Sequence, residues 1–239
     1  MSIIITVSNQ KGGVGKTTTS AAICAGLADR GAKVLGIDLD PQGNLGFCMG
    51  LEGSNPTTIL DALQGKVRVQ QAIRRLKKCD ILPSDISLST TGLEKLAPGK
   101  REVALKEMLQ PLMDYYDYVV IDTPPALNLL TINAYAVSNF LIIPMSSDIL
   151  SLVGLSQLRE TIDTVKQGLN KDLKVLGILL NKFDKFEFDP QEKEKILSDT
   201  IYEVTSSFTM QKSYAIDRNL GYVINFNMWK AIHPRVMMR

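Results

Sequence analysis

A glycine-rich segment with two lysines, at residues 8–18, has the residue types that bind phosphate groups. It reads Ser-Asn-Gln-Lys-Gly-Gly-Val-Gly-Lys-Thr-Thr. Glycines let a backbone approach an anion closely, and the N–H groups of such a loop point at phosphate oxygens together with the N-terminus of the next helix. Lys16 can reach the β- and γ-phosphates of a nucleotide, and the Thr17 hydroxyl can ligate Mg²⁺. The segment therefore predicts a nucleoside triphosphate and Mg²⁺ as ligands.

The segment departs from the common phosphate-loop pattern G-x-x-x-x-G-K-[ST] at its first position. That pattern would place a glycine at residue 10, where the chain has Gln10, and an extra lysine, Lys11, stands inside the loop. The candidate ATP-binding residues are Lys11, Gly12, Gly13, Val14, Gly15, Lys16, Thr17, Thr18 and, from much later in the chain, Asn181.

Carboxylates stand at the ends of two apolar segments that are typical of strands. Asp38 and Asp40 follow residues 34–37, and side chains two apart in a strand point to the same side. A carboxylate there could hold Mg²⁺-bound water or orient the attacking water, although an Asp-Pro-Gln-Gly-Asn run also suits an ordinary turn. Asp122 ends the segment Tyr118–Ile121, which is the arrangement of a Walker B carboxylate that serves the metal.

Asn181 ends another apolar segment, residues 175–180. Its amide could face the edge of adenine. A turn-forming asparagine at the end of a strand is the alternative interpretation.

Several β-branched runs alternate with longer helical patterns. Strands are predicted at 3–7, 33–37, 80–82, 118–121, 140–144 and 175–180, and helices at 17–30, 57–63, 69–77, 103–115, 152–168 and 190–206. Gly31 is expected at the C′ position of the first helix. Alternation of this kind predicts an α/β fold, with a doubly wound, mostly parallel sheet covered by helices on both faces. Ligands of such sheets bind at the carboxyl ends of the strands.

The predicted helix 69–77 and the residues around it are basic. Arg74, Arg75, Lys77 and Lys78 could contact DNA phosphates, or they could form an ordinary solvated face.

Composition bounds the class of protein. The chain has 239 residues, 45% hydrophobic and 22% charged, and a net charge of +2, which is typical of a single globular domain over 1–239 and gives no global signal for nucleic acid. Three scattered cysteines are interpreted as free thiols in a reducing cytoplasm. No signal peptide or membrane-spanning run is visible, so we expect a cytoplasmic protein without stable membrane insertion.

Together these segments resemble the deviant Walker A (ParA/MinD) ATPases, and most closely the ParA/Soj-type partition ATPases. Residues 11–18, 38–44, 81–84, 117–134, 144, 154–158 and 177–184 carry the resemblance, which covers roughly residues 1–205. It implies a P-loop NTPase fold and an ATPase that forms a sandwich dimer.

In such a homodimer Lys11 would reach the phosphates bound by the other subunit and neutralise transition-state charge. The resemblance implies that Lys11, Lys16 and Asp40 are catalytic, with Asp40 positioning the water. Thr17, Asp38 and Asp122 would serve the metal. The ATP-bound dimer would bind DNA non-specifically on the nucleoid, hydrolyse ATP slowly, and be stimulated by a ParB-type protein during plasmid or chromosome partition.

After about residue 206 the sequence no longer follows the family pattern. Residues 200–239 carry five basic residues, Lys212 and Arg218 among them, and two acidic ones, which is compatible with DNA contacts or with solvated charges. A membrane-binding helix of the MinD kind is disfavoured because Pro234 interrupts the tail. The alternatives left open are a MinD-like or other cargo-positioning ATPase at a membrane or protein assembly, and a nucleotide-switched regulator.

Overall fold

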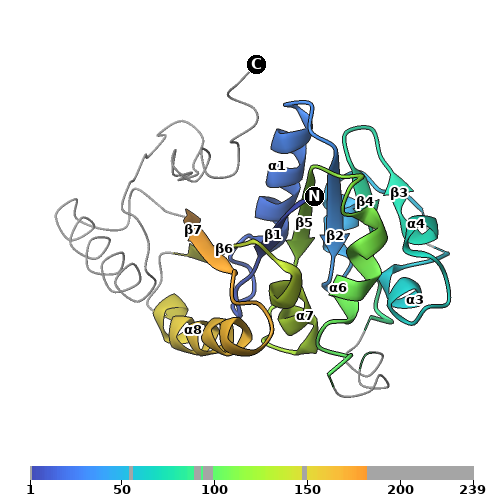
Figure 1. The fold of residues 1–239 in the computed structure, drawn as a ribbon. Coiled ribbons are helices and arrows are strands. Elements are labelled where there is room, and N and C mark those ends of the chain that lie inside the picture. The colour runs from blue at the N-terminus through green and yellow to red at the C-terminus, as the bar shows by residue number, and fades with distance from the viewer. Residues whose placement is uncertain (1, 54–55, 89–92, 94–98, 147–149, 182–239) are drawn as a thin grey trace, which may run out of the picture.

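A computed structural model describes residues 2–53, 56–88, 93, 99–146 and 150–181 (Figure 1). Its centre is a seven-stranded sheet in the order β3-β4-β2-β5-β1-β6-β7. The strands are β1 Ile3–Val7, β2 Val34–Asp38, β3 Arg74–Arg75, β4 Asp80–Leu82, β5 Tyr118–Asp122, β6 Phe140–Ser146 and β7 Lys174–Asn181. All neighbours pair in parallel except β3 and β4, which are antiparallel. The α/β, mostly parallel architecture expected from the sequence is confirmed.

Helices occupy the connections between the strands. They are α1 Lys16–Ala28, α2 Asn44–Cys48, α3 Ile59–Leu63, α4 Val69–Ala72, α6 Ala104–Leu109, the 3₁₀ helix η1 Gln110–Leu112, α7 Leu129–Val137 and α8 Leu150–Gly168. Helix α1 ends in a Schellman motif, because the N–H of Gly31 donates to the Ala28 carbonyl and that of Ala32 to the Leu27 carbonyl. Gly31 has φ 84°, so the predicted C′ glycine is confirmed.

Both faces of the sheet are buried, and alternate residues of each strand face opposite sides. Val119 and Ile121 of β5 pack into the cluster that includes residues of α3, α6, α7 and α8. Tyr118 and Val120 pack on the other side, in the cluster that includes Cys24 of α1. This two-sided burial explains why the strands read as continuous apolar runs.

The structure corrects the predicted helix over residues 69–77. Helix α4 ends at Ala72, and Arg74 and Arg75 form the edge strand β3 opposite Ile81 and Asp80 of β4. Pairing with the neighbouring strand therefore prevails over the local helical pattern. The predicted helix 103–115 is also shorter, because Pro111 falls within the 3₁₀ turn that follows α6. Helices α2 and α7 were not predicted, and the predicted helix 190–206 and the segment 206–239 lie outside the described residues.

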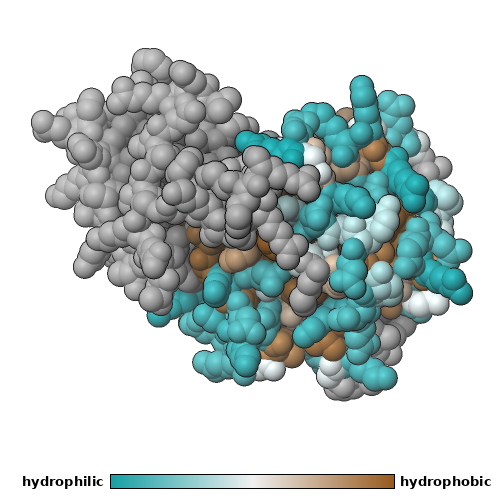
Figure 2. All heavy atoms as spheres, turned by 45° about the horizontal axis from the view of Figure 1, so that its top comes forward, coloured by the Kyte–Doolittle hydropathy of each residue, from teal (hydrophilic) through white to brown (hydrophobic). Residues whose placement is uncertain are grey.

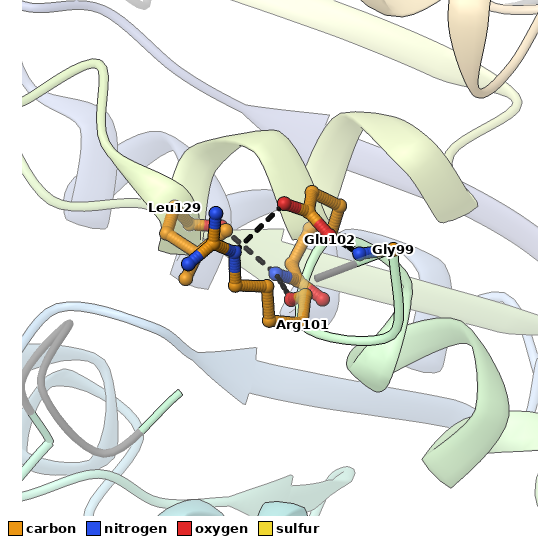
Figure 3. A network of polar contacts seen from close by, with 5 residues as sticks. Gly99, Arg101, Glu102 and Leu129 are labelled. Carbon is orange, nitrogen blue, oxygen red and sulfur yellow. Dashed lines mark hydrogen bonds and ion pairs between the residues drawn. The ribbon is translucent and has the colours of Figure 1, made fainter. Parts of the chain in front are cut away.

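A polar network fastens the segment before α6 to helix α7 (Figure 3). The Nε atom of Arg101 donates to Glu102 at 2.9 Å, and the Gly99 N–H donates to the other oxygen of Glu102 at 2.8 Å. The buried Asn133 donates to the carbonyls of Arg101 and Leu129 and accepts from the Leu105 N–H. The bonds of Asn133 thus join α7 to the segment before α6 and to the first turn of α6.

Figure 2 shows the molecule with the top of Figure 1 turned toward the viewer. On this face the described residues are mostly hydrophilic, with smaller apolar areas between the polar ones. Among the helices that the structure describes, none combines the length and apolar character needed to cross a membrane.

Candidate functional site

The strand register gathers the predicted site residues at one edge of the sheet. Val7, the last residue of β1, lies opposite Asp122 in β5, and Asp122 lies opposite Asp38 in β2. The glycine-rich loop follows Val7 directly, so it sits beside both carboxylates. Residues that are more than 80 positions apart in the sequence therefore share one site because their strands are neighbours.

The loop between β1 and α1 has a conformation that requires glycine. Gly13 and Gly15 have φ of 72° and 92°, in the left-handed region. The loop ends at Gly15, which precedes the first residue of α1, while Val14 is buried. Gly12, Gly13 and Thr18 are exposed, so their backbone can be approached from solvent. A loop of this kind, leading into the N-terminus of a long helix, is suited to bind an anion.

Lys16 lies inside the loop instead of extending into solvent. Its side chain is buried, and Nζ donates to the Lys11 carbonyl at 3.0 Å. Burial lowers the pKa of Lys16, while the charges of Asp122 and Asp40 oppose that change. The ammonium group is therefore held against the loop and feels the negative charge of two carboxylates, at the place where a phosphate would be bound.

The two carboxylate oxygens of Asp122 differ in their hydrogen bonding. Oδ1 accepts a hydrogen bond from Ser20 of α1 at 3.0 Å, whereas the buried Oδ2 accepts none from the described residues. Burial raises the pKa of Asp122 to about 6, and the nearby hydroxyls of Thr17 and Ser20 oppose the rise. A buried oxygen without a partner calls for a cation or a water.

These residues fit Mg²⁺. Within the described ranges, no group of three or more His, Cys, Asp or Glu side chains could hold a metal ion alone. Mg²⁺ commonly takes one or two protein ligands and completes its octahedron with water and phosphate oxygens. The Asp122 carboxylate and the Thr17 hydroxyl are a sufficient protein contribution of that kind.

Asp38 and Asp40 have different environments, although they are only two residues apart. Both oxygens of Asp38 accept backbone N–H groups, from Asp40 and Leu45, at 2.9 Å each. Burial, followed by the charge of Asp122, raises the pKa of Asp38 to about 7. Asp40 accepts the Gln42 N–H at 3.0 Å through Oδ1, and its carbonyl accepts from the Ser84 hydroxyl. Asp38 thus shapes the loop that carries Asp40, and its predicted direct role at the metal stays a prediction.

Asn181 contacts the glycine-rich loop from the end of β7. Its Nδ2 donates to the Val14 carbonyl at 2.8 Å, and its buried Oδ1 has no hydrogen-bond partner among the described residues. An amide oxygen in that position could accept from the amino group of a base. The structure therefore brings Asn181 to the nucleotide loop, and its contact with adenine stays a prediction.

The basic residues predicted to contact DNA lie elsewhere, on and after the edge strand β3. The guanidinium of Arg74 donates to Gln71 and Thr57, and the ammonium of Lys78 lies 2.8 Å from Asp29. Arg75 and Lys77 are exposed. The other two predicted DNA contacts, Lys212 and Arg218, lie outside the described residues.

Sequence reasoning missed several residues that support the site. Ser20 follows Lys16 by one helical turn, so its position on the buried side of α1 could have been inferred from periodicity. Asn9 and Ser84 gave no such signal, because their partners, Pro144 and Asp40, are distant in sequence. Tyr135 gave no signal either, because its hydroxyl donates at 2.8 Å to Ser8, which lies beneath the loop and is distant in sequence.

Comparison with known proteins gives consistent results. A family model described as an AAA domain matches residues 2–175. The chain is 45% identical over 184 residues to the chromosome partitioning protein ParA of Myxococcus xanthus, covering 76% of this chain and 65% of that protein. It is 41% identical over 187 residues to the sporulation initiation inhibitor protein Soj of Bacillus subtilis, covering 77% and 74%. The match thus spans slightly less than two thirds of the Myxococcus protein.

Solved structures resemble the chain over most of its length. A Mycobacterium smegmatis protein, described as cobyrinic acid a,c-diamide synthase with a bound ATP analogue and magnesium, aligns with a TM-score of 0.78 and 36% identity over 84% of this chain and 82% of that chain. McdA of Cyanothece in complex with ATP aligns with a TM-score of 0.76 and 27% identity over 89% and 82%.

Proposed function

The chain belongs to the ParA/Soj family of P-loop partition ATPases, and from that premise we propose that it is an ATP-dependent dimerising ATPase that moves plasmid or chromosomal DNA. The observation that carries the proposal is the burial of Lys16 in the glycine-rich loop, where its ammonium donates to the carbonyl of a second lysine, Lys11. We propose that residues 1–239 form one such domain.

ATP and Mg²⁺ are the ligands that this site would take. The backbone of residues 12–18 and the Lys16 ammonium bind the phosphates, and Asn181 contacts the base. Thr17 and Asp122 hold Mg²⁺, which neutralises phosphate charge when it is bound. The solved relatives that contain an ATP analogue with magnesium, or ATP, support this assignment.

Hydrolysis requires a water in line with the γ-phosphate and a cation that stabilises the transition state. Asp40 orients the water, and Asp38 holds the Asp40 loop through its two backbone hydrogen bonds. Lys11 supplies positive charge to the nucleotide of the partner subunit, as an arginine finger does in other NTPases. Slow hydrolysis by the separate subunit and faster hydrolysis in the dimer follow from this division of the site.

The dimer binds DNA without sequence preference and thereby associates with the nucleoid. Arg75 and Lys77 are the strongest described candidates for phosphate contacts, because Arg74 and Lys78 already have protein partners. Lys212 and Arg218 remain candidates from the sequence. A ParB-type protein would stimulate hydrolysis and release the dimer from DNA.

A salt-titrated DNA-binding assay with ADP, ATP and a non-hydrolysable analogue tests the proposal. We expect binding with ATP or the analogue only, accompanied by dimerisation and falling steeply with salt, and we expect Lys16→Ala to abolish both. A wild-type protein that binds ATP yet stays monomeric would refute it. Binding to lipid or to a protein assembly without DNA affinity would favour a cargo-positioning ATPase, and ATP-dependent partner binding without hydrolysis would favour a regulator.

A further inference from the structure

We propose that Asn9 is the positioning residue of Lys11, and that it fixes the main chain from which the Lys11 side chain extends. The inference rests on the proposed role of Lys11 in the partner's site. Asn9 is 5% exposed and precedes Lys11 by two residues. Its Oδ1 accepts the Lys11 N–H at 3.0 Å, and its Nδ2 donates to the Pro144 carbonyl of β6 at 2.7 Å.

The side chain of Asn9 replaces a main-chain bond of the sheet. Strand β1 pairs in parallel with β6, and the ladder continues one residue past β1, where the Ser8 N–H donates to the Ile142 carbonyl at 3.0 Å. The next acceptor along β6 in such a ladder is the Pro144 carbonyl, two residues further. The side-chain amide of Asn9 donates to that carbonyl in place of a main-chain N–H. The backbone after Ser8 is therefore released from the sheet while remaining attached to its end.

Both backbone groups of Lys11 are hydrogen-bonded, one of them to Asn9. Its N–H is bound by Asn9, and its carbonyl accepts from Nζ of Lys16 at 3.0 Å. The Lys16 ammonium has three donors, so its bond to the Lys11 carbonyl would share that group with a bound phosphate. The bond from Asn9 shares no group with a phosphate, so it can hold the Lys11 main chain whether or not a nucleotide is bound.

The residue type at position 9 matches this task. An asparagine side chain offers one acceptor and one donor from the same amide, and Asn9 uses both. Aspartate would keep the acceptor for Lys11 and lose the donor for Pro144. Alanine would lose both. The neighbouring Ser8 is fixed independently, by the hydroxyl of the buried Tyr135 at 2.8 Å, so a change at Asn9 acts on the loop and leaves the end of β1 in place.

Amide hydrogen exchange of Lys11 tests the positioning directly, and it needs neither ATP nor a dimer. We expect Asn9→Ala to accelerate exchange of the Lys11 N–H about tenfold and Asn9→Asp to change it by less than about threefold, because the acceptor of the Lys11 N–H is lost only in the first. Asn170→Ala is the matched control: it also removes two side-chain hydrogen bonds, to the carbonyls of Tyr135 and Ser138, away from the loop. Equal Lys11 exchange in wild type and Asn9→Ala would overturn the inference.

A double-mutant cycle on ATP turnover shows whether Asn9 acts through Lys11. We expect Asn9→Ala to lower kcat about tenfold while ATP affinity stays within about threefold, and to have no further effect on a Lys11→Ala background. A purely structural role would lower turnover equally in both backgrounds and would refute the inference. If wild-type protein neither dimerises nor hydrolyses ATP, the proposed function fails, whereas the exchange result still decides whether Asn9 positions Lys11.

Discussion

Gly15 and Asn181 meet at the base of the nucleotide loop, although 166 positions separate them. A Cβ atom at Gly15 would lie 2.7 Å from Nδ2 of Asn181, the same atom that donates to the Val14 carbonyl at 2.8 Å. The loop at the start of the domain is thus closed by the last described strand. Any side chain at position 15 would displace Asn181 from that place.

Gly15→Ala should destabilise the protein by about 2 kcal/mol or more, because a left-handed φ of 92° is added to the collision with Asn181. Chemical unfolding in urea measures the change. Gly12→Ala is the matched control, since a Cβ there meets no atom within 4 Å and its φ is ordinary. Similar stabilities for the two variants would show that the loop relaxes around position 15.

Tyr135→Phe should cost about 1 kcal/mol of stability, because the fully buried hydroxyl donates to Ser8 beneath the loop. Urea unfolding of the variant and of Tyr115→Phe provides the measurement. Tyr115 is 51% exposed, so removal of its hydroxyl should change little. A loss that is equal in both variants would contradict the importance of the Tyr135–Ser8 bond.

Stability of the protein without nucleotide or Mg²⁺ should fall as the pH rises from about 4 to about 7. Burial raises the pKa of Asp122 from 3.8 to about 6 and that of Asp38 from 3.8 to about 7. Between these values the folded state binds more protons than the unfolded state, so each group contributes a slope of up to about −1.4 kcal/mol per pH unit.

Asp122→Asn keeps an acceptor for Ser20 and removes one of the two titrations. The slope between pH 4 and pH 6 should therefore become shallower, and the part due to Asp38 should end at a lower pH than in the wild type, because the Asp122 charge that helps to raise the Asp38 pKa is gone. Unfolding curves at half-unit pH intervals decide this. An unchanged slope in the variant would mean that Asp122 titrates normally.

Removal of Arg75 and Lys77 should weaken DNA binding of the ATP form and reduce its dependence on salt. Each lost phosphate contact lowers the slope of log K against log salt by about 0.9, so Arg75→Ala/Lys77→Ala should lower it by up to about 2. Lys78→Ala should change it less, because Asp29 lies 2.8 Å from the Lys78 ammonium. Equal slopes in wild type and double variant would place the DNA contacts elsewhere.

The sequence by itself determined the chemistry and the kind of fold. Apolar runs and glycines are local signals, so the strands that end near Val7, Asp38 and Asp122 could be predicted together with the phosphate loop. Because strands of a doubly wound sheet present their carboxyl ends at one edge, their site residues could also be expected to meet.

Only the tertiary structure decided which residues hold that site in place. The bonds from Asn9 to Pro144, from Ser20 to Asp122 and from Asn181 to Val14 join residues separated by 135, 102 and 167 positions. Strand order creates them: β1 lies between β5 and β6, and β7 lies beyond β6. Sheet pairing likewise converted Arg74 and Arg75 from a predicted helix into an edge strand. Such pairings depend on the assembled sheet, and no local pattern in the chain encodes them.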